Sequence, residues 1–142
     1  MDRIKIYFFT FLLAFFFTKE AISKDNYFSE AEKLFNNKKY LESKFKFEKD
    51  IVFNPKNEKS YLYLAKIFNE EKNELMEEQN LNTVILLNPQ NEEAIFLLTL
   101  LKIKKSDYSE SEKLIRNFKK VCKTLCNKDK ELQIKLESLQ PK

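Results

Sequence analysis

The stretch NPKN at residues 54–57 returns as NPQN at residues 88–91, a shift of 34 residues. The chain has only 3 prolines and no glycine, so these stretches, the first and second joints, are its sharpest breaks. Proline lacks the N–H that a helix interior needs and biases the residue before it away from the α region. A helix must therefore end at the start of each joint. Asn57 and Asn91, which end the two joints, suit the N-cap of the helix that follows.

Apolar residues around the joints recur at spacings of three and four, which is typical of helices that bury one face. Asp107 and Glu110 have the spacing of a capping box at the start of one such helix. No stretch indicates a strand, and a break every 34 residues indicates stacked helical hairpins. The spacing predicts helices over residues 26–37, 40–53, 58–69, 75–87, 94–103, 106–121 and 129–139.

Composition excludes several classes of function. With no glycine in its 142 residues, the chain has no P-loop and no dinucleotide-binding fingerprint. With no histidine it has no Ser-His-Asp or Cys-His site, and its 2 cysteines fall short of the four ligands of a structural zinc site. The carboxylate pairs Glu70-Glu71 and Glu92-Glu93 lie at predicted loops and helix starts, where solvated charge explains them. We therefore expect no enzymatic activity, no cofactor and no metal.

The charge pattern argues against nucleic acid as a partner. The net charge is +4, but lysines and glutamates are interspersed along the chain and form no basic patch. Such a pattern is typical of the solvated surface of a helical protein.

Residues 1–23 have the organisation of a secretory signal peptide. Arg3 and Lys5 give a positive start, residues 6–18 form an uncharged apolar run, and Ala21-Ile22-Ser23 places small residues as a cleavage site requires. The apolar run is shorter than the ~20 residues that a membrane-spanning helix needs. We expect cleavage after this serine and export, to a bacterial periplasm or as a secreted protein. The alternative is an uncleaved N-terminal anchor in the inner membrane.

Counting back from each joint gives a repeated order of large and small residues. The third unit has no proline, and its equivalent position is Lys123. Large residues prevail at the first, third and fifth matched positions, and small residues at the second and fourth. In order, the matched residues are Tyr27, Tyr61 and Ile95; Ala31, Ala65 and Thr99; Tyr40, Glu74 and Tyr108; Ser43, Glu77 and Ser111; and Phe47, Leu81 and Ile115.

This order resembles the tetratricopeptide repeat (TPR), in which a large residue opens helix A, a small one follows where the two helices cross, an aromatic opens helix B, and a proline closes the unit. Glu77 departs from it, because a small residue is expected there. The resemblance covers residues 24–123 and implies an all-α fold, a right-handed α-solenoid of stacked helical hairpins. It divides the domain 24–142 into repeats of about 24–57, 58–91 and 92–125 and a C-terminal capping helix over 127–140.

Members of the family bind proteins or peptides in a concave groove lined by helix A. Some grip a terminal carboxylate with lysine and asparagine, but Phe28 and Glu32 take two of those places here, so a partner helix or an extended segment is expected instead. Carried over by position, the resemblance implies a groove lined by Phe28, Glu32 and Phe35, by Leu62, Lys66 and Asn69, and by Phe96, Leu100 and Ile103.

These features predict an exported, non-catalytic scaffold or adaptor that binds a protein or peptide partner in a cell-envelope complex. Two alternatives stay open. In one, the chain is a structural protein that forms a homo-oligomer, with the groove filled by a second copy. In the other, an uncleaved N-terminal segment holds the repeats at a membrane surface.

Cys122 and Cys126 lie beside the position of the missing third proline. In an exported chain, two cysteines commonly form a disulfide. Within a regular helix, the Cβ atoms of residues four apart are ~5–6 Å from each other, whereas a disulfide needs ~3.5–4.5 Å. A bridge therefore requires the sixth helix to break at this point. Both states, bridged and free, stay open.

Overall fold

The computed structural model describes residues 26–139, so the segment predicted as a signal peptide, residues 1–23, lies outside the described residues. Within residues 26–139 the chain is helical and has no strand. The helices are α2 (Asn26–Asn36), α3 (Tyr40–Phe53), α4 (Glu58–Glu70), α5 (Glu74–Leu87), α6 (Glu92–Lys104), α7 (Tyr108–Val121), the short 3-10 helix η1 (Cys126–Lys128) and α8 (Asp129–Leu139).

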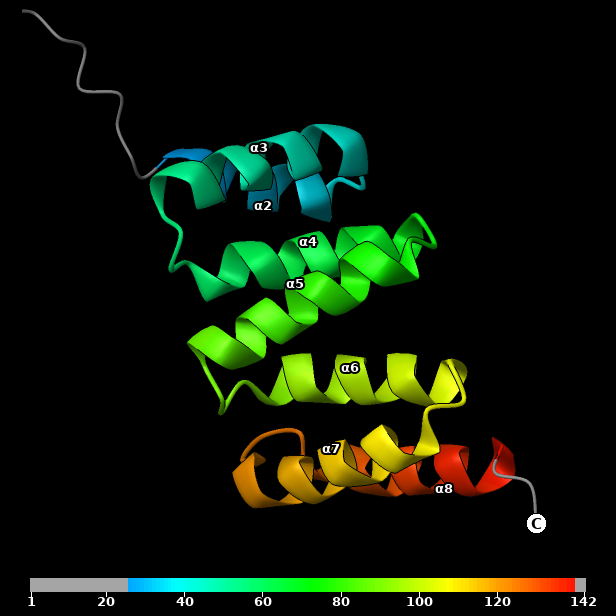
Figure 1. The fold of residues 1–142 in the computed structure, drawn as a ribbon. Helices are drawn as coiled ribbons and strands as arrows, with labels where there is room; N and C mark the ends of the chain where they lie inside the picture. The colour runs from blue at the N-terminus through cyan, green and yellow to red at the C-terminus, as the bar shows by residue number, and fades with distance from the viewer. Residues whose placement is uncertain (1–25, 140–142) are drawn as a thin grey trace, which may run out of the picture.

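The helices stack as three hairpins, α2 with α3, α4 with α5, and α6 with α7 (Figure 1). Each B helix also packs against the A helix of the next hairpin, α3 against α4 and α5 against α6. Helix α8 packs against both α6 and α7 and covers the end of the stack. The prediction of an all-α solenoid of hairpins with a C-terminal capping helix is therefore confirmed.

The turns inside the three hairpins share one geometry. Lys38, Lys72 and Ser106, again 34 residues apart, have φ angles of 59°, 57° and 58°. In the first turn, the N–H of Lys38 donates to Phe35 O (2.8 Å) and the N–H of Lys39 donates to Leu34 O (2.9 Å). The same pair of bonds recurs in the other two turns. In this helix ending one residue takes the left-handed conformation, a position where glycine is usual. In this chain lysine or serine occupies the position.

The first joint (residues 54–57) is built on a buried carboxylate. Asp50 is 1% exposed and accepts hydrogen bonds from Asn54 (3.0 Å), Asn57 (2.7 Å) and the Ser60 hydroxyl (2.5 Å). Asn57 occupies the N-cap position of α4, but its side chain makes no capping hydrogen bond. The expectation that this side chain caps α4 is therefore wrong, because its amide is used by Asp50 instead.

The second joint (residues 88–91) uses a different partner. The positions that match Asp50 and Ser60 are Val84 and Ala94, and both are fully buried. The Asn88 amide instead donates to Glu58 Oε1, at 2.8 Å. Here the predicted cap is present, because the Asn91 side chain accepts from the N–H of Ala94 at 3.0 Å.

The predicted capping box at the start of α7 is only half formed. Asp107 accepts a hydrogen bond from the N–H of Glu110, at 3.3 Å. The Glu110 carboxylate pairs with Lys113 (3.0 Å), one turn further along the exposed face of α7. The cap on α7 therefore comes from Asp107 alone.

Two apolar clusters make up the core, and α4 contributes to both. The N-terminal cluster includes Phe47 from α3 with Ile67 and Phe68 from α4. The C-terminal cluster starts at Leu62 and Ala65 of α4 and continues through α5, α6 and α7 to α8. The small residues at the positions where the two helices of a hairpin cross are buried: Ala31, Ala65 and Thr99 are 0%, 1% and 0% exposed.

Candidate functional site

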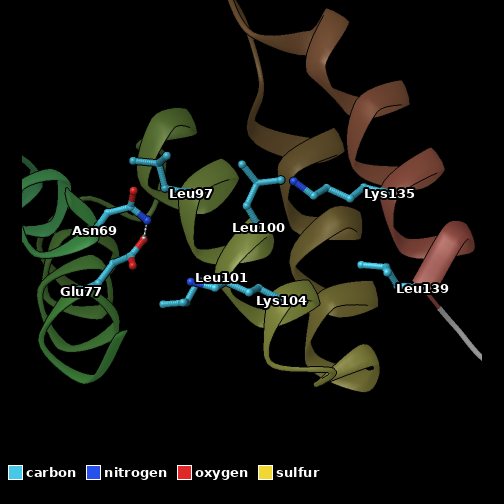
Figure 2. Close-up of a pocket in the computed structure, with 8 residues that line it drawn as sticks. All are labelled: Asn69, Glu77, Leu97, Leu100, Leu101, Lys104, Lys135 and Leu139. Carbon is cyan, nitrogen blue, oxygen red and sulfur yellow. Dashed lines mark hydrogen bonds between the residues drawn. The ribbon is translucent and has the colours of Figure 1, made fainter. Parts of the chain in front are cut away.

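A groove runs along the A helices and is formed by two connected cavities. The larger, about 400 Å³, lies between α4, α5, α6 and α8 (Figure 2). The smaller, about 270 Å³, lies toward the N-terminal hairpin, where Phe35 of α2 meets Ala65 and Lys66 of α4. Both cavities are lined by Asn69, Glu77 and Leu97, which makes them parts of one groove.

The wall of the larger cavity is mostly apolar. Leu97, Leu100 and Leu101 line it because spacings of three and four place them on one face of α6. Leu139 of α8 adds a further apolar side chain from the capping helix. Such a surface suits an apolar side chain of a ligand.

Two lysines stand at the edge of the larger cavity. Lys104 forms an ion pair with Glu74 (2.8 Å), and this contact raises the pKa of its ammonium. Lys135 reaches from α8 toward α6 (Figure 2) and forms no ion pair with any residue between 26 and 139. The C-terminal end of the groove therefore keeps one cation that the described part of the chain does not neutralise.

The floor between the two cavities carries a buried carboxylate. Glu77 is only 4% exposed, and burial raises its pKa above the usual range. The Asn69 amide donates to its Oε1 at 3.0 Å, as Figure 2 shows. In the first and third hairpins the matched position holds a serine, Ser43 or Ser111. The carboxylate is thus particular to the middle of the groove.

The N-terminal cavity has a more polar edge. Lys66 pairs with Glu93 (2.7 Å) and lies 5.1 Å from the ring centre of Tyr63. Burial raises the pKa of Tyr63 to about 12, with help from its hydrogen bond to Glu32 (2.8 Å). Glu70 lines the same cavity and brings a second carboxylate close to the position of Glu77.

The structure places the nine residues predicted to line the groove in two groups. Phe35, Lys66, Asn69 and Leu100 line one or both cavities. The other five, Phe28, Glu32, Leu62, Phe96 and Ile103, line neither cavity.

The five others are held by contacts inside the protein. Leu62 and Ile103, at 8% and 1% exposed, belong to the C-terminal core cluster. The Phe28 ring packs against the rings of Phe47 and Tyr63, Glu32 accepts from the Tyr63 hydroxyl, and Phe96 packs on the C-terminal core.

Sequence reasoning missed eight residues that line the groove: Ala65, Glu70, Glu77, Leu97, Leu101, Lys104, Lys135 and Leu139. Glu77 was visible as a departure from the small-residue position, although its orientation toward the groove was not. Leu97 and Lys104 each lie one position after a residue predicted to line the groove from α6, so a slightly wider face of that helix would have included them. Lys135 and Leu139 belong to the capping helix, and no repeat spacing predicts where that helix lies.

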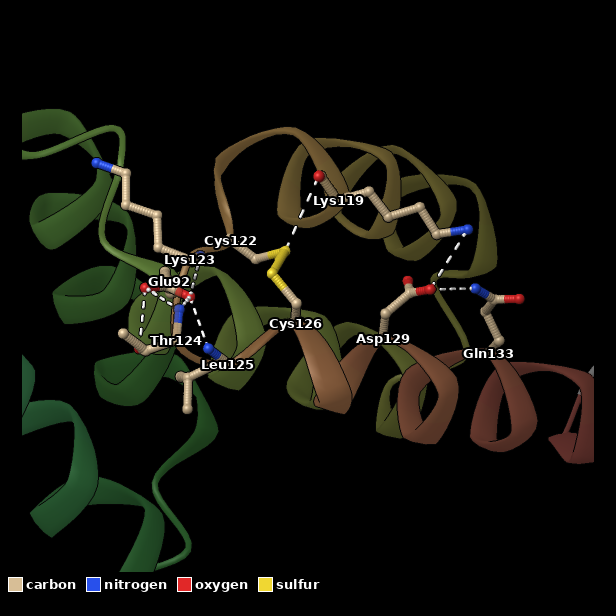
Figure 3. The surroundings of a disulfide bond; sticks show 9 residues. All are labelled: Glu92, Lys119, Cys122, Lys123, Thr124, Leu125, Cys126, Asp129 and Gln133. Atoms are coloured by element: carbon tan, nitrogen blue, oxygen red, sulfur yellow. Dashed lines mark hydrogen bonds and ion pairs between the residues drawn. A yellow bond between two sulfur atoms is a disulfide. The ribbon is translucent and has the colours of Figure 1, made fainter.

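The third joint (residues 122–125) begins at Cys122, and Cys126 follows it directly. Helix α7 ends at Val121, and Cys122 and Cys126 form a disulfide across the break (Figure 3). The chain between them wraps around the Glu92 carboxylate at the start of α6. That carboxylate accepts from the N–H groups of Lys123 (2.8 Å), Thr124 (3.0 Å) and Leu125 (2.8 Å).

The hydrogen bonds at Glu92 hold its pKa at about 2, and the N–H of Leu125 contributes most. Glu92 matches Glu58, which holds the second joint through Asn88. The first residue of each of these A helices therefore fastens the joint that follows its own hairpin. The sequence accounts for Glu92 only as solvated charge at a helix start and does not predict these contacts.

No group of three or more cysteine, aspartate, glutamate or histidine side chains within residues 26–139 is arranged to hold a metal ion. None of the helices in this range is long and apolar enough to cross a membrane.

Three solved structures illustrate what the fold is similar to. The first TPR of Spaghetti (RPAP3), bound to the HSP90 peptide SRMEEVD, has a TM-score of 0.71 at 18% identity and covers 80% of this chain and 90% of its own. The Sgt2 TPR domain from Aspergillus fumigatus has a TM-score of 0.69 at 13% identity, over 86% and 87%. The second TPR domain of human RPAP3, with the HSP70 peptide SGPTIEEVD, has a TM-score of 0.67 at 16% identity, over 86% and 96%.

No protein-family model matches the chain, and no curated protein sequence does. The likeness therefore lies in the three-dimensional arrangement. With TM-scores of 0.67 to 0.71 to these TPR domains, the chain has the tetratricopeptide-repeat fold.

Proposed function

We propose that the chain is a non-catalytic protein-interaction module that holds a helix or an extended segment of a partner protein in its groove. The observation that carries the proposal is the pair of connected cavities along the A helices, with an apolar wall and a few polar groups at the floor and edge. This combination is the usual make-up of a binding site. Two of the similar TPR structures hold a peptide, which supports the same use of the fold here.

The proposal extends to where the protein works. The charged start and apolar run of residues 1–23 favour export to the cell envelope. The disulfide between Cys122 and Cys126 supports the same location, because disulfides persist in oxidising compartments. N-terminal sequencing of the protein recovered from cells tests this. A start at Lys24 is expected, and a start at Met1 would indicate an anchored form instead.

Self-association is the second candidate, and one observation favours it. Helices α3 and α5 expose large apolar side chains, with Leu41 at 76%, Val52 at 75% and Leu86 at 81%. Exposed apolar surface is a common feature of interfaces between protein chains. Light scattering on the purified protein separates the two functions, since an adaptor without its partner is expected to be a monomer.

Position-resolved photo-crosslinking tests the role of the groove. A photoreactive phenylalanine analogue replaces Leu100, which lines the larger cavity, or Leu86, which is exposed on α5 as a matched control. In intact cells, the adduct is expected from position 100 and not from position 86. Adducts only from position 86 would contradict the proposal, and an adduct with a second copy of the chain would support self-association.

A further inference from the structure

The carboxylate of Glu77 occupies a place that the other two hairpins give to a serine. Ser43 and Ser111 donate to backbone oxygens, Ala31 O at 2.8 Å and Asp107 O at 2.7 Å, and so complete the packing inside the protein. Glu77 is larger and lines both cavities of the groove. The middle hairpin therefore replaces a packing residue by an acidic group that borders the site.

Inside the protein, the hydrogen-bonding capacity of Glu77 is only partly used. Its Oε1 accepts from Asn69, while no donor among residues 26–139 reaches its Oε2. Lys104 lies near enough to influence it, but the Lys104 ammonium is bonded to Glu74. A carboxylate with 4% exposure and one hydrogen bond is costly to keep ionised unless a further partner arrives.

The surroundings of Glu77 indicate what that partner carries. Glu70 lines the smaller cavity together with Glu77 and adds negative charge. Lys66, which lines the same cavity, is neutralised by Glu93. The larger cavity also has an apolar wall that includes Leu97, Leu100 and Leu139, and Leu97 lines both cavities, as Glu77 does. A cationic group at Glu77 and an apolar group on the α6 wall would fill both features together.

We propose that Glu77 selects the partner of the groove by binding a lysine or arginine side chain, next to an apolar side chain that packs on Leu97 and Leu100. The inference rests on the proposed function, since it names the partner chemistry of the same groove. It differs from what the similar structures hold, whose peptides SRMEEVD and SGPTIEEVD end in acidic residues. The Lys135 ammonium, which forms no ion pair within residues 26–139, lies at the edge of the larger cavity on α8.

A displayed library of short random peptides is the probe. Bound to the full chain, the library is expected to become enriched in lysine or arginine next to leucine, isoleucine, methionine or phenylalanine. The enriched peptides, synthesised and labelled, are then measured against three forms of the protein: wild type, Glu77→Gln and Glu48→Gln. Glu48 is exposed on α3, away from the groove, so its variant makes the same charge change as a control.

Glu77→Gln keeps an oxygen that can accept the hydrogen bond from Asn69. It is expected to weaken the binding of these peptides by about tenfold or more, because it removes one partner of a buried charge pair. Glu48→Gln is expected to leave their affinity within about twofold. Replacing the basic residue of a peptide by methionine should weaken its binding to wild type and leave its binding to Glu77→Gln nearly unchanged. Thermal unfolding of each variant checks that the fold is kept.

Different failures point to different claims. Enrichment of acidic peptides, or equal affinity of the peptides for wild type and Glu77→Gln, would overturn the role of Glu77. If the same peptides no longer bind the Leu97→Asp variant, the groove is still the binding site. If no peptide is enriched, or if the enriched peptides bind Leu97→Asp as well as wild type, both the role of Glu77 and the proposed function fail.

Discussion

The turns inside the hairpins are alike, whereas the joints that follow the hairpins are all different. Lys38, Lys72 and Ser106 repeat one backbone geometry at the same spacing. The first joint uses the buried Asp50, the second uses Glu58, and the third uses Glu92 and a disulfide. Tight turns leave the backbone few choices, so they recur whatever the side chain. A joint must also fix how one hairpin sits on the next, and several side-chain arrangements achieve that.

The largest effect is expected at the first joint. Asp50→Ala leaves the donors of Asn54, Asn57 and Ser60 without their acceptor in a buried place. We expect a loss of about 2–4 kcal/mol in the free energy of unfolding, measured by urea denaturation. Asp50→Val with Ser60→Ala imports the buried pair of the second joint and should cost less than Asp50→Ala alone. A double variant that is the less stable of the two would contradict this interpretation.

The third joint is expected to depend on its disulfide. Cys122→Ser with Cys126→Ser removes a short cross-link and should lower the stability by about 2 kcal/mol. Adding a reductant to the wild type should reproduce the loss, and the reductant should have no effect on the double variant. Equal stability of the oxidised and reduced wild type would show that the hydrogen bonds to Glu92 hold the joint without the bridge.

Acid should weaken the third joint through Glu92. Its folded pKa of about 2 lies below its ordinary value near 4.5, so its contribution is present above pH 4.5 and is lost as the pH falls toward 2. Thermal melting measured at several pH values between 4.5 and 2 should show that acid lowers the stability of wild type more than that of Glu92→Gln. If the stability of both proteins falls equally with pH, the N–H groups of Lys123, Thr124 and Leu125 do not depend on an ionised carboxylate as their acceptor.

The smallest effect is expected at the turns. Lys72→Gly removes the cost of a positive φ at a residue with a side chain and should raise the stability by about 0.5–1 kcal/mol. Lys38→Gly and Ser106→Gly should gain similar amounts. Gln79→Gly, in the middle of α5, is the matched control and should lose about 0.5–1 kcal/mol. A turn that loses stability on receiving glycine would mean that its side chain does more than tolerate the geometry.

The helices could be predicted from the sequence because proline acts locally. The 34-residue return of the Asn-Pro pair placed the ends of α3 and α5. No proline placed the break after Val121, which the sequence required only if Cys122 and Cys126 form a disulfide. The joints could not be predicted, since Asp50 and Ser60 are brought together only when α3 packs on α4.

The groove could be predicted only in part. Periodicity identifies one face of a helix, but it does not give the angle at which that face meets the next hairpin. Lys66 and Asn69 therefore line the groove, while Leu62, one turn earlier on the same helix, is turned into the core. Lys135 and Leu139 belong to a helix outside the repeat, so no counting from the joints could place them.

The most direct test of the account follows the leucine methyl groups by NMR in the full chain. A peptide enriched by display is titrated into protein with labelled leucine methyls. We expect the methyl signals of Leu97, Leu100 and Leu139, which line the larger cavity, to shift on binding. The signals of Leu41, Leu75 and Leu86, which are exposed on α3 and α5, should not shift. Shifts confined to Leu41, Leu75 and Leu86 would contradict the assignment of the groove as the binding site.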